Sequence, residues 1–272
     1  MGDHDNLQMV TYKIRKVKKN GYCDQTDLIV REKAITIYVN SEELATVVCS
    51  PSDLVYLVVG FLCSEGILVN RQDLKDITVE EDKGLVYVEV NEYEHKLAGK
   101  LFLKRYITPC CGRSRASFYY TTDALLCKNV VSDTRITAGR VRALAGELEE
   151  RSKLFHRTGG VHSAALADDE RVLIFQQDIG RHNTLDKIMG QCFLKEIQLD
   201  DKVIVFSGRV SSEILLKAAK MGVPILISRS APTDLALELA DDLGITVIGF
   251  ARGDKFNIYT HYHRVLVEDD ID

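Results

Sequence analysis

The feature that most constrains the fold is a pattern that occurs four times in the second half of the sequence. A short apolar run ends near residues 175, 206, 227 and 250, and each run is followed by a turn that carries an arginine. Helical patterns follow the first three turns, at residues 183–193, 212–220 and 233–243. This alternation of strand and helix predicts a layered α/β fold. Because ligands bind at the carboxyl ends of the strands in such a sheet, we expect the four turns to share one edge.

Further elements complete the prediction for this half, which begins near residue 122. Apolar residues at helical spacing predict a helix over residues 137–155. Strands are expected at residues 161–166, 172–175, 203–206, 224–227 and 246–250, and a closing strand pair at 256–259 and 265–267.

The turns supply the candidate binding residues. They are Gly180, Arg181, His182 and Asn183; Ser207, Gly208 and Arg209; Ser228, Arg229 and Ser230; and Ala251, Arg252, Gly253, Asp254 and Lys255. Cations are unfavourable beside the positive end of a helix dipole unless an anion offsets them, so four arginines there indicate a polyanionic ligand such as a pyrophosphate ester. The alternative is that each turn is a helix cap with a solvated arginine.

The overall charge excludes a protein that coats nucleic acid, because 35 Lys plus Arg stand against 40 Asp plus Glu, a net charge of −5. The sequence also has neither the P-loop pattern G-x-x-x-x-G-K-[ST] nor a G-x-G-x-x-G turn after a strand. An anion is therefore bound at a local site that is neither a P-loop nor a dinucleotide-binding turn.

The first half predicts a small α+β domain. Strands are expected at residues 11–19 (a charged edge strand), 34–39, 45–49, 85–90 and 101–106, with one helix that begins at residues 50–53 and ends near Gly66. We place an N-terminal domain at residues 1–108 and an α/β domain at 109–272. No run is long enough to cross a membrane and no secretory signal is present, so we expect a cytoplasmic protein.

A cysteine pair lies at the junction of the two halves, in a loop over residues 107–120. Cys110 and Cys111 have Lys104 and Arg105 before them and basic residues after them, and such surroundings favour the reactive thiolate. The alternative is two ordinary thiols in a basic loop. Seven cysteines at irregular spacing do not indicate disulfides, and we expect the other five to pack in the core.

A zinc site is not predicted. Pro109-Cys110 is similar to the start of the P-C-x-x-C motif of zinc deaminases, but Arg113 stands where the second cysteine is required. The residue two after His162 is alanine instead of the required glutamate. His261 and His263 lack a third ligand, so we expect them at the surface.

Several motifs together resemble the formate dehydrogenase accessory sulfurtransferase family, FdhD. They are GVHSA at residues 160–164, GRHNTLDK at 180–187, SGRVS at 207–211, FARG at 250–253, IYVN at 37–40 and GFLCSEG at 60–66. The resemblance covers nearly the whole chain.

The resemblance implies a function and a set of partners. Family members accept persulfide sulfur from a cysteine desulfurase and pass it to the molybdenum or tungsten bis(molybdopterin guanine dinucleotide) cofactor that formate dehydrogenase needs. The family fold is cytidine-deaminase-like without the zinc, and members form homodimers. Residues 250–255, which add Phe250 to the candidates, match the family's cofactor-binding segment.

One departure from the family concerns the cysteines. The familiar loop reads C-G-x-C-G, and alignment on Cys111 and Gly112 puts Ser114 at the second cysteine. We therefore expect Cys111 to carry the persulfide as nucleophile, with Cys110 as a substitute for the missing thiol. Two other functions stay open: a chaperone that binds the cofactor without sulfur chemistry, and a zinc nucleoside deaminase.

Overall fold

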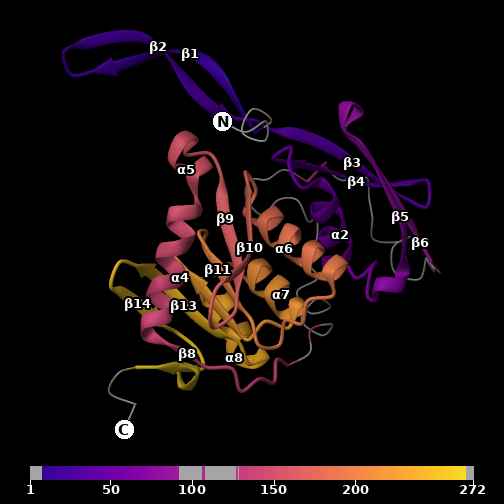
Figure 1. The fold of residues 1–272 in the computed structure, drawn as a ribbon, viewed down its shortest axis with the longest axis vertical. Helices are drawn as coiled ribbons and strands as arrows, with labels where there is room; N and C mark the ends of the chain where they lie inside the picture. Colours follow the sequence, from indigo (N-terminus) through magenta and orange to yellow (C-terminus); the bar gives the residue numbers. More distant parts are fainter. Residues whose placement is uncertain (1–7, 92–105, 108–126, 128, 268–272) are drawn as a thin grey trace.

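The structure, a computed structural model, describes residues 8–91, 106–107, 127 and 129–267 of the 272-residue chain. The chain begins with a two-stranded antiparallel ribbon, β1 (Met9–Lys18) and β2 (Gly21–Val30), which extends away from the rest of the molecule (Figure 1). Only strand β1 was expected here. Strand β2 escaped prediction because its polar and apolar residues do not alternate, and the ribbon has no core that would require alternation.

A five-stranded sheet follows, in the strand order β5-β6-β3-β4-β7. Its strands are β3 (Lys33–Val39), β4 (Glu42–Cys49), β5 (Leu74–Glu80), β6 (Leu85–Val90) and β7 (Tyr106–Ile107). Helix α2 (Leu54–Ser64) packs its buried residues on one face of this sheet. Two 3₁₀ turns, η1 (Arg71–Asp73) and η2 (Glu81–Lys83), flank β5. Strand β5 was not predicted, and most of the strand expected at 101–106 lies outside the described residues.

The larger sheet has six strands in the order β10-β9-β11-β12-β13-β14. These are β9 (His162–Ala167), β10 (Val172–Asp178), β11 (Val203–Phe206), β12 (Ile225–Ser228), β13 (Thr246–Arg252) and β14 (Lys255–Ile258). Strands β11, β12 and β13 are parallel, whereas β9 is antiparallel to both of its neighbours. Strands β10, β11, β12 and β13 therefore run in one direction, and the four arginine turns lie at the same edge, as the sequence predicts.

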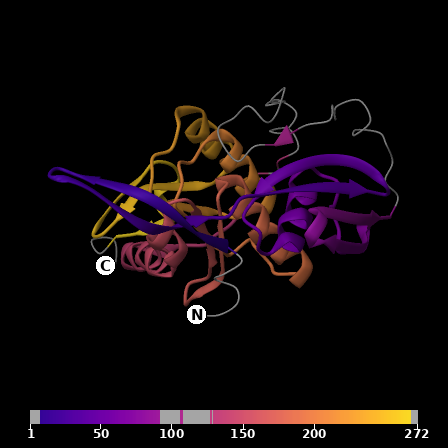
Figure 2. The same ribbon diagram turned by 90° about the horizontal axis from the view of Figure 1, so that it is seen from above.

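Helices cover both faces of this sheet and form three layers (Figures 1 and 2). Helix α4 (Ala138–Arg151) packs on one face, with α5 (Lys153–Thr158) directly after it, and α6 (Arg181–Lys195), α7 (Ser212–Met221) and α8 (Asp234–Leu243) pack on the other. Because both faces are covered, every residue of β11 and β12 is buried, which explains the apolar runs at residues 203–206 and 225–227.

Two expectations for this half are wrong. The helix expected over residues 137–155 is two helices, because the backbone leaves the helical region at Ser152, whose hydroxyl bonds back to the Leu148 carbonyl. The expected closing strands do not pair with each other. Strand β14 joins β13, whereas β15 (Val265–Leu266), which follows the 3₁₀ turn η3 (Tyr262–Arg264), pairs with β8 (Ile136–Thr137).

The two sheets are joined by the crossing of α2 and α6, where the backbones touch. A Cβ atom on Gly60 would overlap the carbonyl oxygen of Asp186, and one on Gly190 would overlap that of Tyr56. Glycine at these two positions lets α2 lie against α6 without intervening side chains, and this helix pair brings the two sheets together. No helix in the described part of the chain is long and apolar enough to cross a membrane.

Candidate functional site

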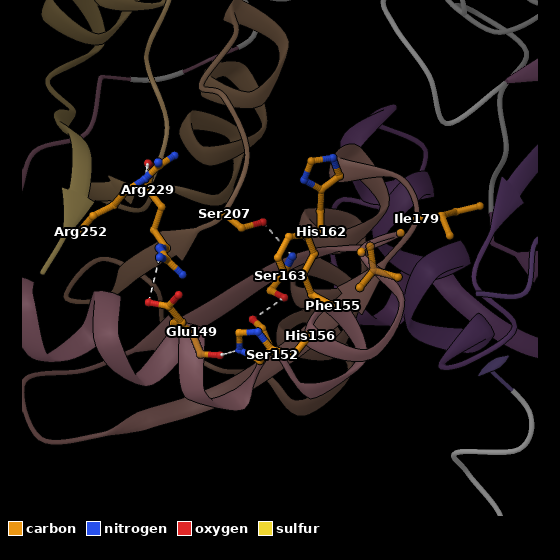
Figure 3. A pocket seen from close by; sticks show the side chains of 13 residues that line it. Glu149, Ser152, Phe155, His156, His162, Ser163, Ile179, Ser207, Arg229 and Arg252 are labelled. Atoms are coloured by element: carbon orange, nitrogen blue, oxygen red, sulfur yellow. Dashed lines mark hydrogen bonds and ion pairs between the residues drawn. The ribbon is translucent and has the colours of Figure 1, made fainter. Parts of the chain in front are cut away.

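A pocket of about 470 Å³ opens at the edge of the six-stranded sheet where β11 and β12 end (Figure 3). Its walls come from three places: the end of α4 with α5, the start of β9, and the turns after β10, β11 and β12 with the end of β13. The lining residues are Glu149, Ser152, Phe155, His156, Gly159, Gly160, Val161, His162, Ser163, Ile179, Ser207, Arg229 and Arg252. The pocket therefore includes three of the predicted binding residues, Ser207, Arg229 and Arg252.

Two arginines form the cationic side of the pocket. The Arg229 guanidinium lies 2.8 Å from a carboxylate oxygen of Glu149, on the last turns of α4. The Arg252 Nε donates to the Arg229 carbonyl oxygen at 2.7 Å, which holds Arg252 against the turn after β12 (Figure 3). A ligand phosphate would thus meet one guanidinium that has a carboxylate partner and one that is anchored through its Nε.

Serines fix the floor of the pocket. The Ser152 and Ser163 hydroxyl oxygens are hydrogen-bonded at 2.7 Å, and the Ser163 backbone N–H donates to the Ser207 hydroxyl at 2.9 Å. These bonds connect α4, β9 and the turn after β11, so three separate elements hold the pocket at a fixed width. Ser207, one of the predicted binding residues, accepts one of these bonds through its hydroxyl.

His162 and Arg181 lie together at this edge. Burial, and then the Arg181 charge, lowers the pKa of His162 below its ordinary value, so the imidazole is neutral at neutral pH. The Arg181 Nε is buried and has no hydrogen-bond partner among the described residues. Gly208 is required beside them, because a Cβ there would lie 2.9 Å from the Phe206 ring and 3.3 Å from His162.

Asn183, another predicted binding residue, is hydrogen-bonded inside the protein. Its amide donates to the Val48 carbonyl and to Asp178, at 2.9 and 2.8 Å. Asp178 also accepts the Ser50 N–H and lies 2.8 Å from Lys187, and neither charged side chain is exposed. This buried cluster ties the end of β10 to the segment after β4, and it places Asn183 outside the pocket.

The other predicted binding residues lie around the pocket. Ser228 is buried and donates to the Gly208 carbonyl, and the Ser230 N–H donates to Ser228. Gly180 caps α6, His182 lies 3.3 Å from Glu213, Ala251 is buried, and Arg209, Phe250, Gly253, Asp254 and Lys255 are exposed. Phe250 has a φ of 53°, a strained conformation for an aromatic residue of the kind that clusters at functional sites.

Sequence reasoning missed the wall that α4 and α5 contribute, above all Glu149 and His156. Nothing near these residues marks a site, because their placement depends on the break in the helix at Ser152. His162 and Ser163 did carry a signal, since they belong to the GVHSA motif.

Cys110 and Cys111 lie outside the described residues. Of the other cysteines, Cys49, Cys63 and Cys192 are buried as predicted, and burial raises the pKa of each thiol to about 12. Cys127 is half-buried against the core of the larger sheet. The prediction is wrong for Cys23, which lies on β2 of the ribbon, away from any core. In the described ranges, no three His, Cys, Asp or Glu side chains are grouped closely enough to hold a metal ion.

The fold and the pocket define an α/β protein with an arginine-lined site at the edge of its larger sheet. The chain belongs to the FdhD/NarQ family, whose model matches residues 30–266. It is 47% identical over 252 residues to the sulfur carrier protein FdhD of Bacillus pumilus (strain SAFR-032), covering 93% of this chain and 95% of that protein. It is also 47% identical over 254 residues to the sulfur carrier protein FdhD of Geobacillus kaustophilus (strain HTA426), covering 93% and 96%.

A crystal structure from Desulfotalea psychrophila, described as a putative formate dehydrogenase accessory protein, has the same fold. Its TM-score is 0.79 at 22% identity, and the match covers 95% of this chain and 100% of that one.

Proposed function

We propose that this protein is a sulfur carrier that passes persulfide sulfur to the bis(molybdopterin guanine dinucleotide) cofactor used by formate dehydrogenase. The observation that carries the proposal is the 47% identity, over 93% of the chain, to a protein named sulfur carrier protein FdhD. Sulfur transfer through cysteine also fits the vicinal pair Cys110 and Cys111 in the sequence.

The chemistry begins with the Cys111 thiolate. It attacks the outer sulfur of a persulfide on a cysteine desulfurase, the S–S bond of the donor breaks, and the donor cysteine leaves as a thiolate. Cys49, Cys63 and Cys192 are poorly suited to this step, because a thiol with a pKa of about 12 is almost wholly protonated at neutral pH. The second cysteine of the family's loop is Ser114 in this chain, so Cys110 takes its place and exchanges sulfur with Cys111.

The acceptor is bound as a substrate at the arginine edge. Its two pyrophosphates match the charge of Arg229 and Arg252 in the pocket and of Arg181 and Arg209 beside it. The unpartnered Nε of Arg181 supports this assignment, because a buried guanidinium nitrogen costs free energy unless a ligand accepts its hydrogen. The protein's own contribution is to hold the cofactor so that the persulfide reaches its metal.

Mass spectrometry tests the carrier role. The purified protein is incubated with a cysteine desulfurase and cysteine, and the cysteine peptides are then analysed for an added sulfur atom. We expect the addition on Cys111, retained in Cys110→Ala and lost in Cys111→Ala. Cys23 is the matched control. It lies on the surface ribbon and outside the basic cysteine loop, so a specific transfer should leave it unmodified. A protein with no added sulfur on Cys111 or Cys110 would refute the proposal.

Arginine variants test the cofactor site. Arg229→Ala and Arg252→Ala each remove one charge-assisted contact and should weaken binding of guanine nucleotides by about tenfold in isothermal calorimetry. Arg209→Ala separates two binding modes. A ligand confined to the pocket keeps its affinity, whereas one that spans the whole edge loses affinity as well. Unchanged binding in all three variants would favour the alternative interpretation, in which each turn is a helix cap and its arginine is solvated.

A second candidate is a cofactor chaperone without sulfur chemistry. It needs the arginine edge but no thiol, and Arg229 and Arg252 line the pocket. A Cys110→Ala/Cys111→Ala variant that still supports an active formate dehydrogenase would select the chaperone over the sulfur carrier.

The proposal also extends to the location, fold, domain boundary and partners expected from the family resemblance. It includes a cytoplasmic location, a cytidine-deaminase-like fold of the three-layered part and a domain boundary at residue 108. It also includes a desulfurase and a formate dehydrogenase as partners.

A further inference from the structure

His162 lines the pocket, and the proposed function gives it no role. It is the first residue of β9, and Ile179 and Ser207 from the neighbouring turns line the pocket with it (Figure 3). Arg181 follows Ile179 by two residues and is the first residue of α6. Its charge acts on the His162 imidazole, so the two side chains lie close together at this part of the pocket.

The Arg181 guanidinium has no counter-ion among the described residues. Its Nε is buried and has no hydrogen-bond partner there. Asp178, the cross-strand partner of His162, is already engaged, because it lies 2.8 Å from Lys187 and accepts the Gly180 N–H at 2.9 Å. This carboxylate balances Lys187, so the positive charge of Arg181 remains to be balanced by an anion.

Ser207 and Gly208 complete the surroundings of His162. The Ser207 hydroxyl accepts the Ser163 N–H at 2.9 Å, and within the described ranges nothing accepts its own hydrogen. A Cβ on Gly208 would lie 3.3 Å from the His162 Nδ1, so glycine keeps the space beside the imidazole open. A hydroxyl donor, a guanidinium and an accessible imidazole together suit a phosphate group.

We propose that His162, in its protonated form, binds a phosphate group of the ligand together with Arg181. This inference rests on the proposed function and deepens it. A phosphate beside both side chains offsets the Arg181 charge and favours the imidazolium, which takes its proton from the solvent. The imidazolium then donates a charge-assisted hydrogen bond to a phosphate oxygen, which the neutral ring cannot do.

The charges around His162 give the direction of the pH dependence. Burial and then the Arg181 charge lower its pKa, whereas Asp178 acts in the opposite direction. The other ionisable groups that line the pocket are Glu149, His156, Arg229 and Arg252. Of these, Glu149 and Arg229 pair with each other at 2.8 Å. A bound phosphate removes the main charge that opposes protonation of His162, so ligand binding takes up a proton and tightens as pH falls.

Calorimetry in two buffers of different ionisation enthalpy measures this proton. The ligand is GDP-mannose, a pyrophosphate diester whose phosphates do not titrate near neutral pH. Wild type should take up about half a proton or more on binding near pH 6.5, and its affinity should fall about tenfold between about pH 6 and about pH 8. Guanosine, which has no phosphate, should bind without proton uptake. Equal uptake with both ligands would overturn the inference.

Two histidine variants assign the proton. His162→Gln keeps a polar side chain that cannot be protonated, so it should lose the proton uptake and the pH dependence, and bind about tenfold more weakly than wild type near pH 6. His156→Gln is the matched control, because it removes the other histidine of the pocket and should retain the uptake. Uptake that persists in His162→Gln, or disappears in His156→Gln, would place the proton on another group and contradict the proposal.

NMR of the wild type gives a second readout that needs no variant. With histidine labelled with ¹⁵N, saturating GDP-mannose should raise the pKa of His162, and guanosine should leave it unchanged. A pKa of His162 that GDP-mannose does not raise would overturn the inference, even if His162→Gln failed to fold.

Failure of this inference and failure of the proposed function give different results. GDP-mannose that binds without proton uptake would remove the role of His162 and leave the cofactor site in place. A wild type that binds no guanine nucleotide would overturn both the cofactor site and the role of His162. The persulfide assay on Cys111 involves no nucleotide, so it tests the sulfur carrier role independently.

Discussion

At the scale of single residues, the buried pair of Asp178 and Lys187 shows how a motif residue can serve structure. Both charges are withdrawn from water, which is costly unless each is paired and hydrogen-bonded. Asp178 meets this condition with the N–H groups of Ser50 and Gly180, and Lys187 with the Gln177 carbonyl at 3.2 Å. The GRHNTLDK motif thus combines an edge residue, Arg181, with interior ones.

Removing the lysine leaves Asp178 as an uncompensated buried charge. Lys187→Met should therefore lower the free energy of unfolding by about 3–5 kcal/mol in urea titrations. Lys75→Met, at an exposed lysine, should change it by less than about 0.5 kcal/mol. A loss below about 1 kcal/mol in Lys187→Met would show that the ion pair with Asp178 does not stabilise the fold.

His162 makes stability depend on pH. Its pKa is lowered in the folded state, so as pH falls through about 6.5 the unfolded chain takes up a proton that the folded chain does not, and the free energy of unfolding declines. Above that pH the contribution is fully present. NMR titration should place the pKa of His162 below 6.5, and Arg181→Gln should raise it. A His162 pKa that does not change in Arg181→Gln would show that the Arg181 charge does not act on His162.

At the scale of secondary-structure elements, the crossing of α2 and α6 decides how the two sheets are joined. Around Gly60 and Gly190 the helices are in backbone contact, and Lys217 of α7 adds an ion pair with Asp186 and a hydrogen bond to Ser64 at 3.1 Å. A glycine inside a helix is normally destabilising. Here the close packing that glycine allows offsets this cost.

Alanine at the crossing should separate the helices. Gly60→Ala places a methyl group on the Asp186 carbonyl, and we expect a loss of about 2–4 kcal/mol in the free energy of unfolding. Gly146→Ala is the matched control, because this exposed glycine of α4 has nothing within 4 Å of an added Cβ. It should stabilise by about 0.5–1 kcal/mol. Equal effects in the two variants would exclude backbone contact at the crossing.

At the scale of the whole molecule, each sheet has its own core, yet polar clusters and a helix pair bind one to the other. The Asp178 cluster takes hydrogen bonds from the segment after β4, and Lys220 of α7 donates to the Ser64 carbonyl at 2.8 Å. These contacts come from several elements on each side. They favour a molecule that unfolds as one unit, although the sequence shows two different patterns.

Calorimetry tests this coupling. The wild type should unfold in a single transition with equal calorimetric and van't Hoff enthalpies. Gly60→Ala/Lys217→Ala, which weakens the contact between the sheets, should split or broaden the transition. Two resolved transitions in the wild type would instead show two independently folding parts.

The sequence by itself determined the α/β class, the strands β9 to β13 and the shared edge of the four arginine turns. Hydrophobic periodicity specifies the type of each element, and the carboxyl ends of parallel strands must meet. It also indicated the family, through motifs whose residues are distributed over most of the chain.

Only the tertiary structure decided which of those residues form a pocket. Arg229 and Arg252 enter it, whereas Asn183 and Ser228 bond to distant backbone groups that local patterns cannot reveal. Glu149 and His156 join it because α4 stops at Ser152, and the base of the ribbon packs on Leu154 and Val161, residues distant from it in the sequence. Local sequence sets what each segment is, while long-range packing sets what each side chain meets.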